Sequence, residues 1–392
     1  MILCLLAFLL NIVSGIDSNI DIDVDSTSTQ QFSFLAVGDW GGAALDTQAY
    51  DNVYAVSAQM AKTATKASPK FILGIFIIIH YYYYIIIIII IIINIIIIII
   101  GTGDNFYWCG IQNTSDFQVP VDWTKPYTNA ALDLDWYQIL GNHEYGYNVS
   151  AQIDLANTLP RWIMDDRYYT KRIQASSNVY ISLIFLDTSP CVTAYRVNNS
   201  AGWDPCSKQY PTCSQQSTDD DFEGQCYFYQ NIMSQDCKTQ YDWFQQQLDA
   251  VPADDWLIVA GHHPIDEADV EDFTTILQKR GFSIYFNGHV HSLQQYTLDY
   301  KGAYVTTGAG SLVNTVDQTH PKTVAKLNGE DINVVGESAA GSHSYQTVFS
   351  SITAGFNLNT FSKDFSSLQV QYISYTGQVL HTFNVYKNGT TF

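Results

Sequence analysis

The sequence predicts an α/β fold in which polar loops meet at one edge of a sheet. Five short apolar runs, FSFLAV, KFIL, WYQIL, WLIVA and FSIYF, each lead to a glycine-led polar motif. Short apolar runs that end at glycine are typical of buried strands. Ligands of an open α/β sheet gather outside the carboxyl ends of its strands, so loops far apart in sequence can converge. The five motifs are GDWG at Gly38, GDNFY at Gly103, GNHE at Gly141, GHHP at Gly261 and GHVH at Gly288.

The length and charge of the chain limit its organisation and partners. The chain has 392 residues and no interior Pro/Gly/Ser-rich linker, which predicts one domain over residues 31–392. The formal net charge is −20. This charge argues against a nucleic-acid partner, because phosphate contacts need a basic face.

The N-terminus resembles a signal peptide over residues 1–15, although it has no basic region. Met1–Val13 is almost wholly apolar and precedes Ser14 and Gly15; an uncleaved anchor is the alternative. Four N-x-S/T sequons agree with passage through the secretory pathway. We therefore expect a secreted or lysosome/endosome protein without a stable membrane span. The candidate glycosylation sites are Asn113, Asn148, Asn198 and Asn388.

Six cysteines lie outside the leader, and this even number favours disulfide pairing. Five of them fall in a polar stretch from Cys191 to Cys237, which predicts a cysteine-rich insertion over residues 191–237. The connectivity stays open, and Cys109 could reach into the insertion. A zinc site is not favoured, because the sequence has no CxxC pair.

Residues 75–100 are nearly all isoleucine and are unlike any ordinary globular segment. The run is long enough to span a membrane, but a span here would separate Asp39 from the other motifs. Our hypothesis is that the run is translated intron sequence. Its removal with one glycine would restore KFILGTGDNFY, a normal strand and polar loop. No ligand role is given to His80.

The motif residues together predict a pair of metal ions. Carboxylate, amide, imidazole and phenolate donors suit iron with a divalent partner. Asp104 can bridge two cations, and His289 and His291 share one face of an extended segment. The phenolate of Tyr107 favours a trivalent ion.

These motifs resemble those of the purple acid phosphatases, most closely the tartrate-resistant type 5 group of the calcineurin-like metallophosphoesterases. The resemblance extends from about Phe32 to Val385 and includes YVTTGAG, LQVQYIS and HTFNVY, but not the isoleucine run or the cysteine-rich insertion. Gly41 stands where many two-metal phosphoesterases carry a histidine, and Tyr107 is the complementary addition. The resemblance implies a four-layer αββα sandwich of two mixed sheets faced by helices, with a dinuclear centre at one edge between them.

The resemblance also implies an acid phosphatase, a phosphoric monoester hydrolase in which a metal-held hydroxide attacks small phosphate monoesters or phosphoproteins. It implies that Asp104 bridges the ions and that His143 contacts phosphate and protonates the leaving alcohol. We expect a monomer. The remaining ligands would be Asp39, Tyr107 and His291 for Fe(III), and Asn142, His262 and His289 for divalent Fe, Zn or Mn.

The chain departs from the family pattern after GHHP. The family usually carries a second histidine several residues further on, where this chain reads IDEADVED. Either His263 replaces it as a catalytic residue or assistance to the leaving group is weaker; Glu267, Asp269 and Glu271 are possible substitutes. The cysteine-rich insertion could cover the mouth of the site. The alternative functions are a phosphodiesterase on the same scaffold and a non-catalytic iron-binding secreted glycoprotein.

Overall fold

The computed structural model describes residues 32–44, 46–67, 76–80, 83–87, 97–197, 226–313, 335–337 and 343–392. All described residues belong to the unit Gln31–Phe392. The predicted signal peptide, Asn198, most of the cysteine-rich insertion and nearly half of the isoleucine run lie outside the described residues.

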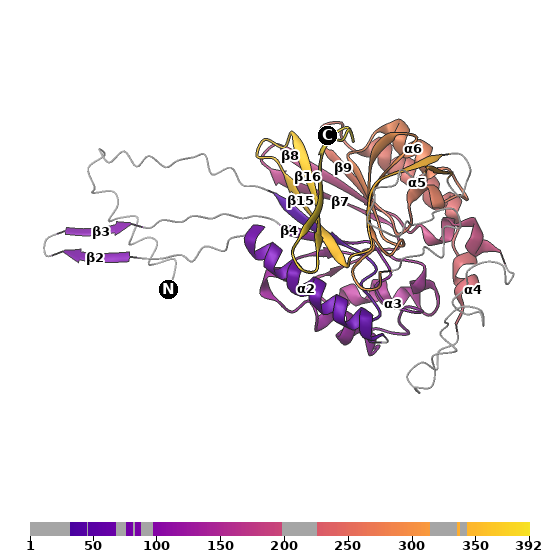
Figure 1. Ribbon diagram of the computed structural model, residues 1–392, viewed down its shortest axis with the longest axis horizontal. Helices are drawn as coiled ribbons and strands as arrows, with labels where there is room; N and C mark the ends of the chain where they lie inside the picture. The colour runs from indigo at the N-terminus through magenta and orange to yellow at the C-terminus, as the bar shows by residue number, and fades with distance from the viewer. Residues whose placement is uncertain are drawn as a thin grey trace. The chain divides into compact units, whose positions relative to one another are not determined.

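The first large sheet is mixed, with the strand order β17-β16-β15-β1-β4-β5-β6 (Figure 1). Strands β1, β4, β5 and β6 run parallel, whereas β15, β16 and β17 are joined to β1 by antiparallel pairing. The bounds are β1 Ser33–Val37, β4 Ile97–Gly101, β5 Trp136–Tyr137, β6 Trp162–Ile163, β15 Gly355–Phe361, β16 Ser367–Ser374 and β17 Val379–Tyr386.

The second large sheet is also mixed, with the order β13-β14-β11-β12-β10-β9-β8-β7. Its central strands β8, β9, β10 and β12 run parallel, and antiparallel pairs flank them on both sides. The bounds are β7 Tyr169–Ser176, β8 Val179–Phe185, β9 Trp256–Ala260, β10 Ile284–Asn287, β11 Leu293–Leu298, β12 Lys301–Thr307, β13 Val335–Glu337 and β14 Ser344–Ser351.

The helices α2, α5 and α6 begin at side chains that satisfy free backbone N–H groups. The carboxylate of Asp46 accepts from Ala49 N at the start of α2, and Asp236 and Asp272 cap α5 and α6 in the same way. The helices are α2 Thr47–Ala67, α3 Val149–Asp154, α4 Phe228–Met233, α5 Cys237–Ala250 and α6 Phe273–Arg280. Short helical turns are η1 Val119–Thr124, η2 Ala130–Leu132, η3 His143–Tyr145, η4 Leu155–Asn157, η5 Ser189–Cys191, η6 Thr193–Arg196 and η8 Ile265–Glu267.

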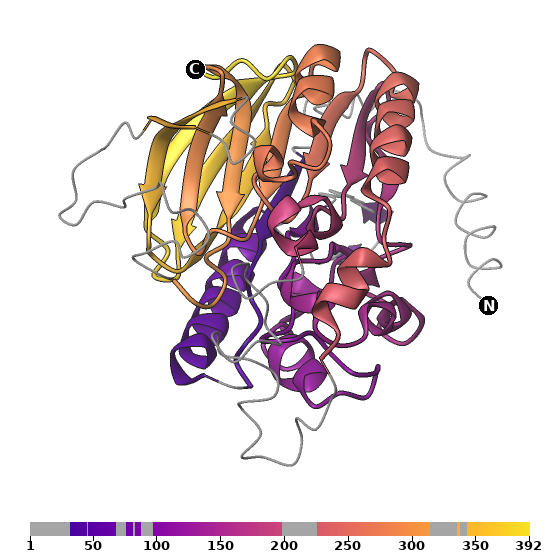
Figure 2. The same cartoon turned by 90° about the vertical axis from the view of Figure 1, so that its right-hand side faces the viewer.

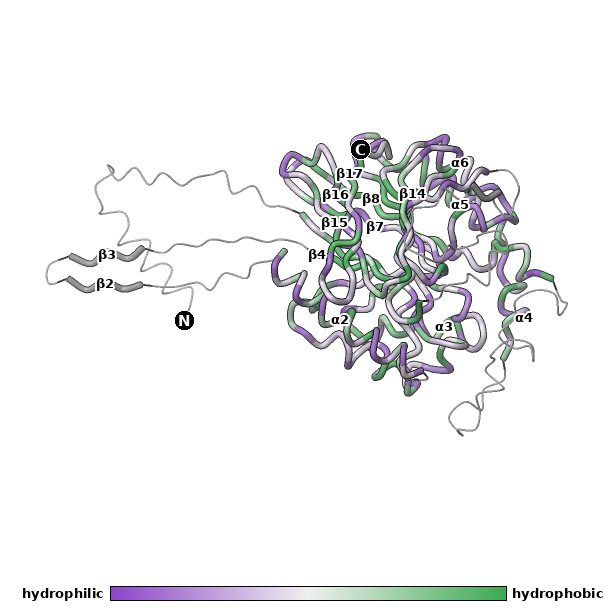
Figure 3. Tube along the Cα trace, viewed as in Figure 1, coloured by the Kyte–Doolittle hydropathy of each residue, from purple (hydrophilic) through white to green (hydrophobic). Residues whose placement is uncertain are grey.

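The two sheets pack face to face, and helices cover their other faces. Phe34 of β1 meets Phe286 of β10 with ring centroids 5.8 Å apart, so one core joins the sheets. Helix α2 adds Met60 to this core, while α5 and α6 bury Phe244 and Leu277 against the second sheet. Figure 2 shows α2 (indigo) and the orange helices on opposite sides of the strands, and in Figure 3 hydrophobic segments gather in the strands. The predicted four-layer αββα sandwich is confirmed.

The strand that leads to Asp104 differs from the one the sequence indicated. Ile97–Gly101 forms β4 beside β1, with Leu35 opposite Ile99 and Ala36 opposite Ile100. The sequence interpretation gave this place to KFIL, which lies outside the described residues. The place beside β1 accepts an apolar strand that ends in glycine, and the last four isoleucines of the run with Gly101 form that strand. Phe76–His80 and Tyr83–Ile87 form the separate two-stranded sheet β2-β3.

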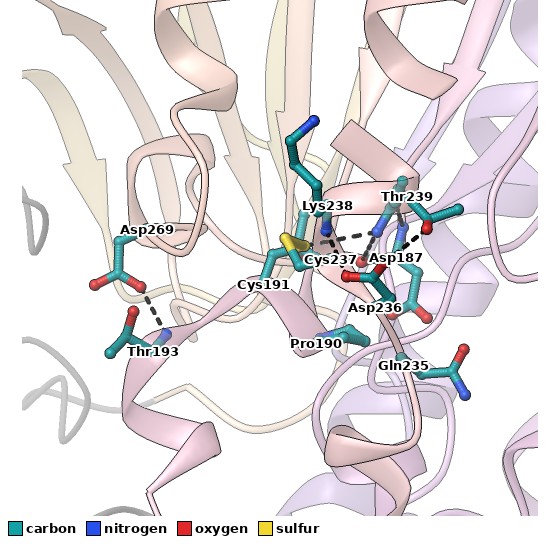
Figure 4. Close-up of a disulfide and its surroundings, with 12 residues drawn as sticks. Asp187, Pro190, Cys191, Thr193, Gln235, Asp236, Cys237, Lys238, Thr239 and Asp269 are labelled. Atoms are coloured by element: carbon teal, nitrogen blue, oxygen red, sulfur yellow. Dashed lines mark hydrogen bonds between the residues drawn. A yellow bond between two sulfur atoms is a disulfide. The ribbon is translucent and has the colours of Figure 1, made fainter. Parts of the chain in front are cut away.

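A disulfide joins Cys191 to Cys237 at the start of α5 (Figure 4). Cys109 and Cys226 are also disulfide-bonded. The prediction of oxidised cysteines is therefore confirmed for these four. Among the described residues, no helix is both long and apolar enough to cross a membrane.

Candidate metal centre

The predicted metal ligands lie just beyond the carboxyl ends of strands from both sheets. Asp39, Asp104 and Asn142 follow β1, β4 and β5 of the first sheet, whereas His262 and His289 follow β9 and β10 of the second. The loops are joined directly: Asp39 N donates to Gly103 O at 3.0 Å, and Gly288 N donates to His262 O at 2.9 Å. The site therefore forms where the edges of the two sheets meet.

One group of donor atoms comprises the side chains of Asp39, Tyr107 and His291. The phenol oxygen of Tyr107 lies 3.2 Å from Asp39 Oδ1 and 2.8 Å from His291 Nε2. Asp39 Oδ1 and His291 Nε2 are 3.5 Å apart. Three donor atoms of different chemistry thus face one another at distances that suit a shared cation.

A second group comprises Asn142, His262 and His289. Asn142 Oδ1 lies 2.9 Å from His262 Nε2 and 3.0 Å from His289 Nδ1. The ring of His262 is held from behind, because its Nδ1 lies 2.8 Å from Thr102 O. A backbone carbonyl at this nitrogen fixes the tautomer that leaves a lone pair on Nε2.

Asp104 lies between the two groups. Its Oδ2 is 3.3 Å from His262 Nε2, and the ligand atoms of Asp39, Asp104 and His262 all lie within 4.8 Å of one another. A carboxylate in this position can bind one ion through each oxygen, as in two-metal sites.

The backbone at three of these side chains is strained. Asp39, Asp104 and His289 have φ angles of 52°, 49° and 64°, a region that residues other than glycine seldom adopt. Neighbouring glycines make room for the carboxylates: a Cβ at Gly288 would lie 2.2 Å from Asp39 Oδ2, and one at Gly141 would lie 2.2 Å from Asp104 Oδ1. The positive φ angles and the neighbouring glycines thus let these three side chains point into the candidate metal centre.

The carboxylate of Glu144 joins two of the loops. It accepts from the backbone N–H groups of Asp104, Asn105 and Phe106 at 3.0–3.1 Å and from Gly141 at 2.5 Å. Burial, with the charge of Asp104, raises the pKa of Glu144 to about 7. From the sequence, Glu144 is expected at most to support the ligands from behind, and the structure shows that it holds the loops of Asp104 and Asn142 together.

The electrostatics of the centre fit bound cations. Burial raises the pKa of both Asp39 and Tyr107 well above their ordinary values, so their anionic forms need compensating positive charge. Burial also opposes ionisation of Asp104, but the charges of His262 and His143, with the hydrogen bonds from both residues, together outweigh it and lower that pKa. The carboxylates raise the pKa of His262 to about 10 despite its burial. Hard anionic donors beside imidazoles are a suitable set for iron and a divalent ion.

His143 lies at the rim of the centre. Its Nδ1 is 2.6 Å from Trp108 O, and its Nε2 is 3.8 Å from Asp104 Oδ2. Its backbone N–H donates to Asp104 Oδ1 at 3.1 Å. Burial lowers the pKa of this imidazole. The side chain is thus held beside the bridging carboxylate and keeps partial exposure.

His263 is buried and engaged by two hydroxyl groups. Its Nδ1 lies 2.8 Å from Thr188 Oγ1, and its Nε2 lies 3.1 Å from Tyr195 Oη. Its ring centroid is 4.2 Å from that of His289. The sequence analysis missed Thr188 and Tyr195. The run VYISLIF before LDTS is a further apolar strand leading to polar residues, and this signal could have found Thr188.

Of the three candidate acidic residues after GHHP, Glu267, Asp269 and Glu271, all within the described residues, only Glu267 lies within ion-pair distance of a predicted ligand. Its Oε2 is 3.6 Å from His289 Nε2, and the side chain is buried. Asp269 instead accepts from Thr193 N at 2.6 Å (Figure 4). Glu271 lies half-buried at the start of the segment leading into α6.

The sequons occupy surface loops where they are described. Asn113, Asn148 and Asn388 are all exposed, and Asn198 lies outside the described residues. The Nδ2 group of Asn148 donates to Gln112 O at 3.2 Å.

The fold and the converging ligands define a metallophosphoesterase. The chain belongs to the calcineurin-like phosphoesterase family, whose model matches residues 32–293. It acts on phosphate esters as a hydrolase of that family.

Among curated proteins, the chain is similar to the tartrate-resistant acid phosphatase type 5 of Mus musculus, with 28% identity over 73% of this chain and 74% of the mouse protein. It is 25% identical to purple acid phosphatase 7 of Arabidopsis thaliana over 74% of this chain and 73% of that protein. Among solved structures, the fold is similar to that of GAP50, described as the anchor in the inner membrane complex of Plasmodium. The TM-score is 0.57 at 16% identity, covering 91% of this chain and 89% of that one.

Proposed function

We propose that the protein is an acid phosphatase that hydrolyses phosphate monoesters with an Fe(III) and divalent metal pair. The observation that carries this proposal is the position of the Tyr107 phenol between Asp39 and His291. A phenolate is a hard anionic donor that favours a trivalent ion. The named likenesses to acid phosphatases support the same conclusion.

The ligand groups divide between the two ions by their chemistry. Asp39, Tyr107 and His291 would hold Fe(III), and Asp104 would be shared between the ions. When bound, the pair would activate the nucleophile and neutralise charge on the phosphoryl oxygens. The set with neutral donors, Asn142, His262 and His289, would hold divalent iron, zinc or manganese.

Two histidines are available for proton transfer. His143 lies beside Asp104 and would contact the phosphate and give a proton to the departing alcohol. His263 is the second candidate, since its Nε2 is hydrogen bonded to the Tyr195 hydroxyl, which could relay a proton. Both roles are parts of the proposal.

The oxidised cysteines, the exposed sequons and the apolar leader support a secreted or lysosome/endosome protein that carries N-linked glycans. We propose small phosphate monoesters or phosphoproteins as substrates, and a monomer as the working state. The cysteine-rich insertion is proposed to cover the mouth of the site.

The test compares hydrolysis of a nitrophenyl phosphate monoester with that of the corresponding diester, using metal-loaded protein across acidic and neutral pH. We expect the monoester to react faster, with an acidic optimum, and Asp104→Asn to abolish the activity. A faster diester reaction would make the protein a phosphodiesterase. A full metal complement without hydrolysis would make it a non-catalytic iron-binding glycoprotein.

A further inference from the structure

We infer that Glu267 is a positioning residue that fixes the imidazole of His289 and thereby sets the affinity of the divalent ion. The inference rests on the proposed function for the presence of that ion, but not for the reaction that the ion supports.

The two ring nitrogens of His289 face different groups. Nδ1 lies 3.0 Å from Asn142 Oδ1, among the donor atoms of the divalent group. Nε2 lies 3.6 Å from Glu267 Oε2, within ion-pair distance. Both side chains are buried, with relative exposures of 8% for His289 and 6% for Glu267. The carboxylate therefore stands behind the ligand rather than in front of it.

A carboxylate in this position selects the tautomer that a metal needs. Through its charge at 3.6 Å, a distance too long for a hydrogen bond, Glu267 favours a proton on Nε2 and so leaves the lone pair on Nδ1, the nitrogen that faces Asn142. Acidic partners of this kind orient the ring and increase the basicity of the ligand, and their loss typically weakens metal affinity 10- to 100-fold.

The neighbouring ligand is held by a partner without charge. The Nδ1 of His262 meets the neutral carbonyl of Thr102 at 2.8 Å. Since Asn142, His262 and His289 are all neutral donors when they bind an ion, Glu267 adds an anionic charge directly behind the divalent group. The affinity of the divalent ion should therefore respond to Glu267 more strongly than that of Fe(III).

The local structure keeps Glu267 in place. It ends the turn η8, and its N–H donates to Pro264 O at 2.9 Å. Three residues later, Val270 N donates to Cys191 O at 3.0 Å, which ties the loop to the segment of the Cys191–Cys237 disulfide (Figure 4). On the other side, the ring of His263 packs against His289 and limits its rotation.

This geometry also decides between two roles for Glu267. A leaving-group acid must reach the substrate on the side of the ions, whereas Glu267 contacts the ring nitrogen opposite to that side. Glu267 therefore acts through His289 rather than on the substrate.

The test measures the affinity of iron-loaded protein for zinc by chelator competition, in the variants Glu267→Gln and Glu267→Ala. We expect zinc binding to weaken roughly 10-fold in the first and up to about 100-fold in the second. Iron content and the visible absorption of the ferric site should not change. Glu271→Gln is the matched control, because it removes one nearby carboxylate that contacts no predicted ligand, and it should bind zinc like the wild type.

The inference is overturned if both Glu267 variants bind zinc within twofold of the wild type, or if Glu271→Gln loses as much affinity. Unfolding of the metal-free proteins shows whether Glu267→Ala folds; if it does not, the isosteric Glu267→Gln decides alone. Weakened zinc binding in a protein that hydrolyses no phosphate ester would support the role of Glu267 and refute the proposed function. Hydrolysis of a phosphate ester together with unchanged zinc affinity in the Glu267 variants would refute the role of Glu267 and support the proposed function.

Discussion

The phenol oxygen of Tyr107 lies 2.8 Å from Nε2 of His291, although 184 positions separate the two residues. Tyr107 follows β4 of the first sheet, and His291 lies between β10 and β11 of the second. Their contact exists only when the sheets are packed together. A cation held between them would therefore bind the folded chain far better than the unfolded one, and would stabilise it by mass action.

Replacing Tyr107 with phenylalanine should remove the colour of the iron-loaded protein. The purple colour of a tyrosinate–iron(III) pair comes from charge transfer from this phenolate, and phenylalanine has no oxygen to donate. Visible absorption and metal content would be measured together. Tyr127→Phe is the control, since it removes another buried phenol among the aromatic residues around Trp123, and it should stay coloured. A colourless wild type with its full complement of metal would contradict the assigned site.

Replacing His143 with glutamine should lower kcat on an alkyl phosphate by roughly 100-fold, because an alkoxide leaves only with a proton. The loss should be smaller on a nitrophenyl phosphate, whose leaving group departs without one. The measurement is kcat for both substrates. His263→Gln is measured in the same way. The histidine whose replacement lowers kcat more on the alkyl phosphate than on the nitrophenyl phosphate, and by the larger ratio, is the proton donor. Equal losses on both substrates would assign His143 to phosphate binding alone.

Replacing Glu144 with glutamine should destabilise the fold by about 2 kcal/mol, because an amide group would turn donors toward backbone N–H groups that need acceptors. Each oxygen of Glu144 serves two N–H groups of the GDNFY and GNHE loops. Urea unfolding of the metal-free protein gives the difference, with Glu271→Gln as the control. A variant as stable as the wild type would show that the loops hold together without this carboxylate.

His343 should make stability depend on pH. Its Nδ1 lies 2.7 Å from Asp299 and its Nε2 3.1 Å from Asp272, and these carboxylates raise its pKa above 6.5 although burial opposes this. The contribution is therefore complete below about pH 6.5 and is lost as pH rises through the higher folded-state pKa. The pKa values of Asp272 and of Asp299, which lies near Lys301, are lowered in the fold. The contribution of these ion pairs is therefore also lost in acid, as pH falls through the lowered pKa values and the carboxylates are protonated.

The measurement is the difference in unfolding free energy between the wild type and His343→Gln at mildly acidic and alkaline pH. We expect about 1 kcal/mol in favour of the wild type in mild acid, a value already reduced for the exposure of Asp272, and less at alkaline pH. A difference that grows toward alkaline pH would show that the bonds are made by the neutral ring.

Deleting Ile75–Gly101 should leave the centre intact, as the intron hypothesis requires. Lys70–Gly74 would then replace Ile97–Gly101 beside β1, with Gly74 at the position of Gly101. A glycine is needed there, because a Cβ would lie 1.7 Å from the side-chain oxygen of Gln138. The deleted form should bind as much metal and aggregate less, because a long β-branched run favours aggregation. Sequencing the transcript between the codons for Lys70 and Asp104 tests the hypothesis, and native peptides from within the run would refute it.

The sequence was a good guide to the class of fold and to the loops, and a poor one to the side chains behind them. An apolar run precedes each of five predicted ligands, and this pattern alone predicts that they lie at the ends of strands. They are Asp39, Asp104, Asn142, His262 and His289. The order of strands within each sheet leaves no such trace in the sequence.

The residues that support the ligands were not predictable in the same way. Glu144 and Thr188 act through contacts that depend on how neighbouring loops fold. The choice of Glu267 over Asp269 and Glu271 depends on the bend at η8, which a run of acidic residues does not reveal. The strand that leads to Asp104 was assigned to KFIL, whereas the structure forms it from Ile97–Gly101. Each is an apolar run followed by or ending in glycine, and periodicity cannot choose between them.

The division of the ligands between the two sheets has a consequence for the timing of assembly. Asp39 follows β1, the first strand of the first sheet along the chain, and its partner His291 follows β10 of the second. Since a chain is synthesised from its N-terminus onward, the carboxylates of Asp39 and Asp104 are made before the imidazoles of His262, His289 and His291. The proposed metal pair can then be bound only after His291 has been made and the two sheets have packed, and the metals available in the compartment where folding finishes would decide which pair of ions the protein carries.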